Sequence, residues 1–169
     1  MSVNIFRYAE IKQAALNVLE ANRIASPPVI AANLAVFYGF KVNTAALGPK
    51  YAKSVAGFID IPAGEIWVNA DDNPALQNYT VAHELGHYLL KHYETEDFEK
   101  NYSVLLREPG GASSQEPMEI EANLFADNLL VPAVFLQKYL DKYSHATDQE
   151  LSNIFGVSPA VIRYRRPYI

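Results

Sequence analysis

The sequence of 169 residues contains no cysteine. Disulfide bonds are therefore excluded, and so is every metal site that needs a thiolate ligand. Any zinc site in this chain must be built from histidine and carboxylate side chains. Because only 4 histidines are present, such a site would draw on a small set of residues.

Long hydrophobic runs are also missing. No stretch approaches the roughly 20 apolar residues that span a bilayer. The N-terminal residues 1–16 include Arg7, Glu10 and Lys12 instead of the apolar centre of a signal peptide. We therefore expect a cytoplasmic protein without a membrane partner, folded as one domain over residues 1–169. The formal net charge of -5 disfavours a phosphate-binding surface over the whole molecule, but it leaves room for a local basic patch.

Hydrophobic periodicity predicts an α+β fold that is mostly helical. A hairpin is expected around Pro62-Ala63-Gly64, which gives a small antiparallel sheet packed on the helix that follows. If one of these strands is a sheet edge, it could accept an extended peptide or simply meet solvent. The predicted helices cover residues 6–22, 29–38, 71–90, 116–130 and 133–143, and the predicted strands cover residues 40–43, 55–61 and 65–69.

The third of these helices contains the motif H-E-x-x-H, formed by His83, Glu84 and His87. At about 100° per residue, the two histidines lie roughly 40° apart on one helix face, so both rings can bind one metal ion. Glu84 is rotated by about 100° from His83, which suits a base for an attacking water better than a third ligand. The alternative is chance spacing, which a shuffled chain of this composition would show in roughly one case in a hundred.

Neighbouring residues support a helix at this motif. Asn73 followed by Pro74 is typical of an N-cap and the first helical position. Gly86 lies between the two motif histidines, where glycine costs about 1 kcal/mol relative to alanine. A requirement for close packing at Gly86 is therefore expected.

The helix predicted over residues 116–130 carries two polar side chains on an apolar stripe. Glu119 and Asn123 share that stripe with Ala126 and Leu130. A buried carboxylate and a buried amide are costly unless they are paired or bound to metal. Glu119 as a metal ligand and Asn123 as the support of a ligand would explain both. The alternative for Glu119 is a solvated residue near a positive helix end, and Glu121 is predicted to face solvent.

The C-terminal segment, residues 145–169, resembles a helix-turn-helix. Residues 147–150 form a capping box, and a tight turn at residues 156–158 precedes another helix start. Arg163, Arg165 and Arg166 would suit a phosphate backbone or an acidic partner. The alternative is a pair of small helices that brace the rest of the domain.

Four ordered blocks carry a resemblance to a known family. They are Gly57-Phe58-Ile59-Asp60, Ile66-Trp67-Val68-Asn69, Tyr79-Thr80-Val81-Ala82-His83-Glu84-Leu85-Gly86-His87, and Glu119-x-Glu121-Ala122-Asn123-x-Phe125-Ala126-x-x-Leu129-Leu130-x-Pro132. With these blocks the chain resembles the ImmA/IrrE family of zinc-dependent endopeptidases over nearly its whole length. It lacks a long C-terminal extension, so we expect none of the functions that larger relatives carry there.

The resemblance implies a zinc site with His83, His87 and Glu119 as ligands and Glu84 as the catalytic residue. It also implies a protein substrate, commonly a helix-turn-helix repressor, and hence a role in transcription regulation. The predicted activity is peptide-bond hydrolysis, in which Glu84 takes a proton from water and delivers it to the leaving amine. Candidates for stabilising the oxyanion are Tyr79, Tyr88, His92, Tyr102 and Arg107.

His92 is not among the expected ligands, so replacing it with alanine is predicted to have little effect on metal content. The alternative function is a non-catalytic, zinc-containing regulator or antitoxin-like module. Such a module would grip a protein partner, or DNA through the C-terminal segment. Structural zinc sites usually have four protein ligands, however, and the sequence offers three.

Overall fold

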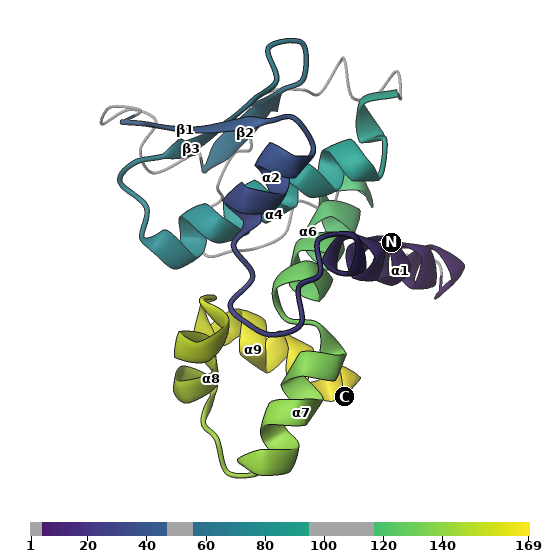
Figure 1. The fold of residues 1–169 in the computed structure, drawn as a ribbon, viewed down its shortest axis with the longest axis vertical. Coiled ribbons are helices and arrows are strands. Elements are labelled where there is room, and N and C mark those ends of the chain that lie inside the picture. The colour runs from purple at the N-terminus through teal and green to yellow at the C-terminus, as the bar shows by residue number, and fades with distance from the viewer. Residues whose placement is uncertain (1–4, 47–55, 95–116) are drawn as a thin grey trace.

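The computed structural model describes residues 5–46, 56–94 and 117–169 (Figure 1). The chain is mostly helical with one small sheet, which confirms the predicted α+β class. The helices are α1 (Ile5–Ala21), α2 (Ala31–Phe37), α4 (Pro74–Leu89), α6 (Pro117–Leu130), α7 (Ala133–Lys142), α8 (Asp148–Phe155) and α9 (Pro159–Arg165), with 3₁₀ turns η1 (His92–Glu94) and η2 (Arg166–Tyr168). The strands are β1 (Lys41–Ala45), β2 (Gly57–Asp60) and β3 (Glu65–Asn69). In this described part of the chain, no helix is long and apolar enough to cross a bilayer.

The sheet has the strand order β1-β3-β2 and lies against α4 (Figure 1). The predicted hairpin is confirmed, because β2 and β3 pair antiparallel on either side of residues 61–64. The prediction of a wholly antiparallel sheet is wrong, since β1 pairs parallel with β3. Strand β3 lies between β1 and β2, antiparallel to β2 and parallel to β1. The alternation of residues along a strand predicts which side chains face the core, but it does not predict the order of strands in the sheet.

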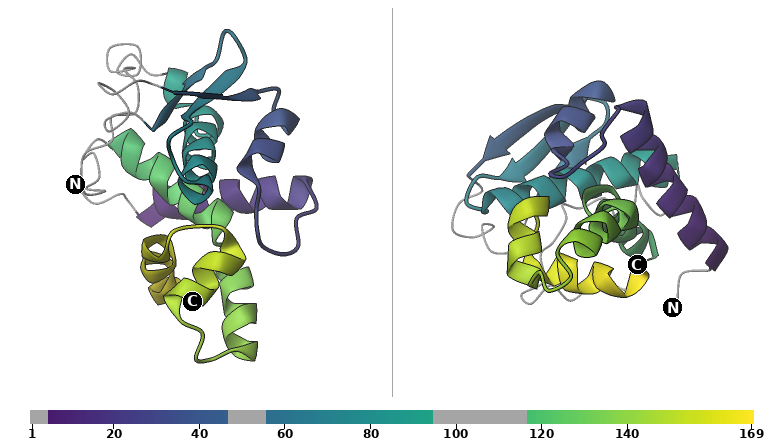
Figure 2. Two further views of the ribbon diagram at one scale, coloured as in Figure 1. Left: turned by 90° about the vertical axis from the view of Figure 1, so that its left-hand side faces the viewer. Right: turned by 60° about the horizontal axis from the view of Figure 1, so that its bottom comes forward.

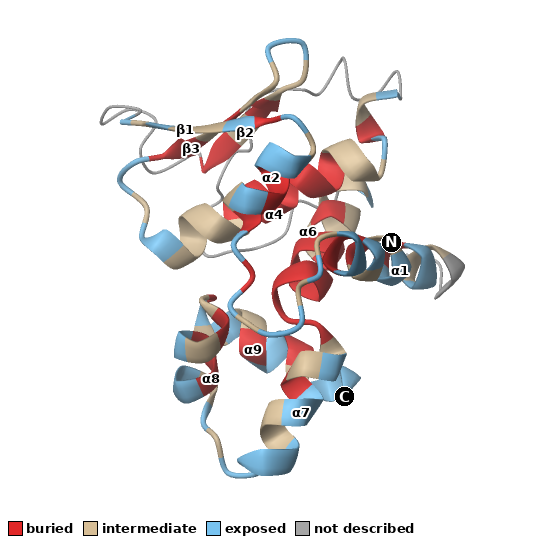
Figure 3. Cartoon of the chain, viewed as in Figure 1, coloured by how far each residue is buried: buried red, intermediate tan, exposed pale blue. Residues whose placement is uncertain are grey.

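Helix α4 begins where its sequence predicts. The Asn73 side chain accepts a hydrogen bond from the backbone N–H of Leu76 at 3.0 Å, and Pro74 occupies the first turn. The middle of α4, from Thr80 to His87, is buried (Figure 3). The motif residues therefore lie in the interior, between the sheet and α6.

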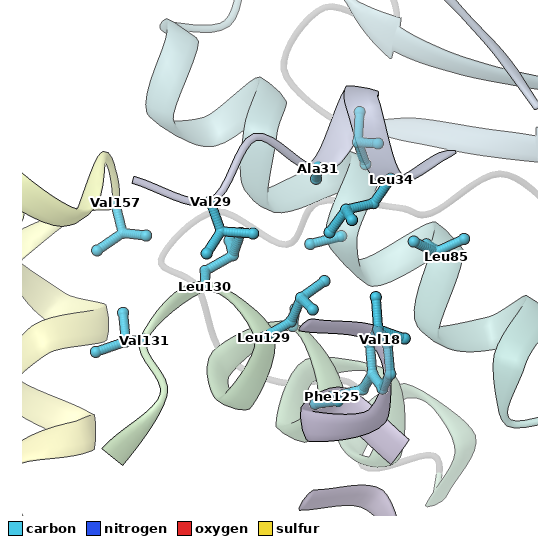
Figure 4. Close-up of a cluster of buried hydrophobic side chains, with 14 of the residues drawn as sticks. Val18, Val29, Ala31, Leu34, Leu85, Phe125, Leu129, Leu130, Val131 and Val157 are labelled. Atoms are coloured by element: carbon cyan, nitrogen blue, oxygen red, sulfur yellow. The ribbon is translucent and has the colours of Figure 1, made fainter. Parts of the chain in front are cut away.

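The core joins elements that are far apart in the sequence. Val18 of α1, Leu85 of α4 and Phe125 of α6 point into one apolar interior (Figure 4). Helix α1 packs on α6, which Figure 2 shows from two further directions. Because α6 is covered by α4 and by α1, more than one of its faces is buried.

Gly86 is the point of close approach between α4 and α6. A Cβ atom built there would lie 3.0 Å from Phe125 Cδ1 and 3.3 Å from the Ala122 carbonyl oxygen. The predicted packing role of this glycine is confirmed.

We expect Gly86→Ala to lower the free energy of unfolding by about 1–2 kcal/mol, because overpacking outweighs the better helix propensity of alanine. Chemical denaturation of the metal-free protein measures this effect. A rise in stability of about 1 kcal/mol, as at an open helical glycine, would contradict the packing role.

The C-terminal helices brace the domain with their arginines. The predicted capping box at Thr147 and Glu150 is present, and Gly156 ends α8 in the left-handed conformation. Arg165 is buried, and its Nε donates to the Val131 carbonyl at 3.0 Å. Arg163 and Arg166 both donate to Asp148. The burial of Arg165 and the ion pair of Arg166 support the bracing interpretation, whereas the Arg163 side chain is 73% exposed.

Candidate metal centre

Helix α4 supplies three side chains of the candidate site. His83, Glu84 and His87 are all buried, with exposed fractions of 3%, 2% and 4%. Histidines four residues apart on one helix face meet at their ring nitrogens, and here the two Nε2 atoms lie 3.0 Å apart. Two imidazole nitrogens at this separation can bind the same metal ion.

Helix α6 supplies the third group. Glu119 Oε2 lies 3.3 Å from His83 Nε2, and Glu119 Oε1 lies 3.2 Å from His87 Nε2. The three potential ligand atoms all lie within 4.8 Å of one another, so this cluster could hold a metal ion. Two imidazole nitrogens and one carboxylate oxygen form a donor set that suits zinc.

The electrostatics of Glu119 favour its ionised form. Burial opposes ionisation, but hydrogen bonds with His83 and His87 outweigh it and hold the pKa of Glu119 well below its usual range. Burial lowers the pKa of His87, which favours the neutral imidazole that a metal requires. An ionised carboxylate beside a neutral imidazole is the protonation state of a ligand pair.

Glu84 lies beside this cluster with one oxygen unsatisfied. Its Oε1 is buried and has no hydrogen-bond partner, while the backbone of Ile59 in β2 provides a hydrogen bond to the carboxylate. Burial raises the pKa of Glu84 to about 7. A carboxyl group with this pKa can take up and release a proton near neutral pH. This unpaired oxygen could accept a hydrogen bond from a water molecule in the site.

Asn123 lies one turn further along α6 from Glu119. Its Oδ1 is 2.8 Å from His83 Nδ1, so Nδ1–H of His83 can donate to it and leave Nε2 free to bind a metal. Tyr79 donates to Asp127 at 3.2 Å and also approaches Asn123 Oδ1, at 3.4 Å. The structure thus brings together all five predicted site residues: His83, Glu84, His87, Glu119 and Asn123.

The prediction that Glu121 faces solvent is wrong. Its side chain does not face solvent, because its exposed fraction is 15% and its Oε2 accepts hydrogen bonds from His92 at 3.0 Å and Arg7 at 2.8 Å. The turn of α6 that carries Glu121 points towards α1 and η1, which cover it. Helical periodicity places Glu121 away from Glu119 but does not say what lies on that side.

Sequence reasoning also missed the contact between His92 and His87. Lys91 adopts a left-handed conformation with φ of 60° just after α4, and η1 then brings His92 to within 2.9 Å of His87 Nδ1. Lysine gives no sequence signal for such a turn.

The described oxyanion candidates have partners of their own. The Tyr79 hydroxyl donates to Asp127, and the Tyr88 ring stacks on Tyr93 with ring centroids 5.7 Å apart. Tyr102 and Arg107 lie outside the described residues.

Comparison with solved structures finds a similar fold in a transcriptional regulator from Mycobacterium tuberculosis. The TM-score is 0.65 at 16% sequence identity, and the match covers 92% of this chain and 46% of that protein. This chain therefore spans about half the length of that relative, and at this identity the likeness shows the fold alone. The search of curated proteins found no match.

Comparison with protein families finds one that matches residues 38–166, more than half of the chain. The matched range includes the strands, α4 with its motif, and α6 with Glu119. It confirms the resemblance drawn from the sequence blocks. The chain belongs to the family of the IrrE N-terminal-like domain, which is a family of peptidases.

Proposed function

We propose that this chain is a zinc-dependent endopeptidase that hydrolyses a peptide bond in an intracellular protein. The observation that carries the proposal is the convergence of His83, His87 and Glu119 beside the unsatisfied, buried oxygen of Glu84. Two imidazoles and one carboxylate leave a fourth position open, which distinguishes catalytic zinc sites from structural ones. Membership in a peptidase family supports the same reading.

His83, His87 and Glu119 would hold the zinc ion, which supplies a Lewis acid and makes a nearby water more acidic. Glu84 takes a proton from the attacking water as the water oxygen bonds to the peptide carbonyl carbon. The C–N bond then breaks, and Glu84 delivers the proton to the leaving amine. A carboxyl group whose pKa lies at about 7 suits both halves of this transfer.

The sheet offers a place for the substrate backbone. Strand β2 is at the edge of the described sheet, and Ile59 of this strand is hydrogen-bonded to Glu84. An extended peptide that runs alongside an edge strand gains backbone hydrogen bonds that are independent of its sequence. We propose that the substrate segment lies along β2, with its scissile bond next to Glu84.

The substrate we propose is a helix-turn-helix repressor, and the role is transcription regulation. The family resemblance supports this choice, and the fold is shared with a transcriptional regulator. The test is co-expression with a helix-turn-helix repressor encoded beside the gene, with intact-mass analysis of both proteins. Repressor fragments would establish the activity and locate the scissile bond. An intact repressor beside fully zinc-loaded protein would contradict this substrate.

The alternative of a non-catalytic, DNA-binding regulator has less support. Arg165 is buried and Arg166 is paired with Asp148, so that of the three arginines Arg163 alone is mostly exposed, at 73%. Within the described ranges, the candidate site has three metal-binding groups rather than the four of a typical structural zinc site.

A further inference from the structure

A chain of hydrogen bonds leads from the protein surface to His87, on the side away from its Nε2. Arg7 of α1 donates to Glu121 Oε2 through Nε at 3.0 Å and through Nη2 at 2.8 Å. The same oxygen lies 3.0 Å from His92 Nε2. His92 Nδ1 in turn lies 2.9 Å from His87 Nδ1. Three elements, α1, α6 and η1, therefore meet behind one residue of the candidate metal centre.

With a metal ion bound at His87 Nε2, the donors and acceptors of this hydrogen-bond network have one consistent assignment. An ionised carboxylate accepts only, so Nε2 of His92 must carry the proton that it donates to Glu121. In a neutral imidazole the other nitrogen is then an acceptor. His92 Nδ1 therefore accepts from Nδ1–H of His87. His87 is left with a lone pair on Nε2, the atom that faces Glu119 and His83.

We propose that His92 is a positioning residue of the metal centre, which fixes the tautomer and ring orientation of His87 while Glu121 and Arg7 fix His92. The inference rests on the proposed role of His87 as a zinc ligand. Ligating histidines usually donate their second N–H to a carboxylate or a carbonyl oxygen, as His83 does to the Asn123 amide oxygen. Here the acceptor is a second histidine, and the carboxylate lies one step further out.

The hydrogen bond between His87 and His92 is buried, so its loss should affect His87. His87 and His92 have exposed fractions of 4% and 3%, so water is poorly placed to replace a lost acceptor. Removing the acceptor would take away the hydrogen bond that Nδ1–H of His87 makes to His92 in the interior. It would also free the ring to adopt the other tautomer, in which Nε2 carries a proton and cannot bind metal. The sequence alone predicted little effect of replacing His92, and the structure changes that expectation.

Two substitutions separate an acceptor role from a packing role. His92→Phe keeps a ring of similar size but has no acceptor, whereas His92→Asn is smaller and can place its Oδ1 near the position of Nδ1. Zinc affinity, measured by competition with a chelator, is expected to fall by about 10–100-fold in His92→Phe. His92→Asn is expected to retain more affinity than His92→Phe.

The control is His145→Phe at an exposed histidine, which should match wild type. The reverse order, with phenylalanine milder than asparagine, would assign His92 a packing role and overturn the proposal.

Imidazole nitrogen NMR of the wild-type protein tests the tautomer without relying on either variant. With only 4 histidines in the chain, each ring can be assigned. The neutral form of His92 is expected to carry its proton on Nε2, the atom that faces Glu121. A proton on Nδ1 of His92 would overturn the proposal. Wild-type protein that binds no zinc would instead overturn the proposed function, whatever the tautomer of His92.

Discussion

Replacing Glu84 with glutamine is expected to leave zinc content unchanged and to reduce peptide hydrolysis by about 10²–10⁴-fold, the usual contribution of a general acid–base group. Glutamine has nearly the same shape as glutamate, so the packing of α4 against the sheet should persist. It has no ionisable oxygen, however, and can neither take the proton from water nor return it to the amine. Repressor fragments are counted by intact mass, and zinc is measured on the same purified sample.

The matched control for this experiment is Glu20→Gln, which makes the same chemical change at an exposed position of α1. It should cleave and bind zinc as wild type does. Loss of zinc in Glu84→Gln would show that Glu84 is a ligand, and undiminished cleavage would show that another group moves the proton. Either result would contradict the proposed mechanism.

Replacing Glu119 with alanine is expected to lower zinc affinity by more than about 100-fold. Mutating a residue that only supports a ligand already lowers metal affinity by about 10–100-fold, and the loss of a ligand should have a larger effect. The substitution removes one of three proposed ligands and leaves only His83 and His87. The Glu119 side chain is 29% exposed, so its loss should not prevent folding. Chelator competition measures the affinity, and circular dichroism of the metal-free protein checks the fold.

Glu20→Ala is the control for this second experiment, because it removes an exposed carboxylate far from the cluster. Its zinc affinity should equal that of wild type. If Glu119→Ala also retained full affinity, Glu119 would not be a ligand, and the third ligand would have to be sought elsewhere in the chain.

Features that depend on a few neighbouring residues could be predicted from the sequence. The cap of α4 at Asn73 and the capping box before α8 formed where their side chains indicated. The hairpin around residues 61–64 followed from its Pro and Gly residues. In each case the stabilising contact lies within about four residues, so short-range geometry suffices.

The candidate metal centre was predictable for a related reason. Four-residue spacing on α4 aligns His83 with His87, and the same spacing on α6 aligns Glu119 with Asn123. The sequence also indicated that the α6 face points inward, because its stripe is otherwise apolar. Two inward faces that carry complementary polar groups then meet across one helix interface.

The sequence by itself determined the helices, their caps, the hairpin and which face of α6 turns inward. Only the tertiary structure decided that β1 runs parallel to β3, that Arg165 is buried, and that Glu121 is covered rather than exposed. The bond from Arg7 to Glu121 joins residues 114 positions apart. Periodicity assigns a side chain to a face, but the partner on that face is set by the packing of the whole chain.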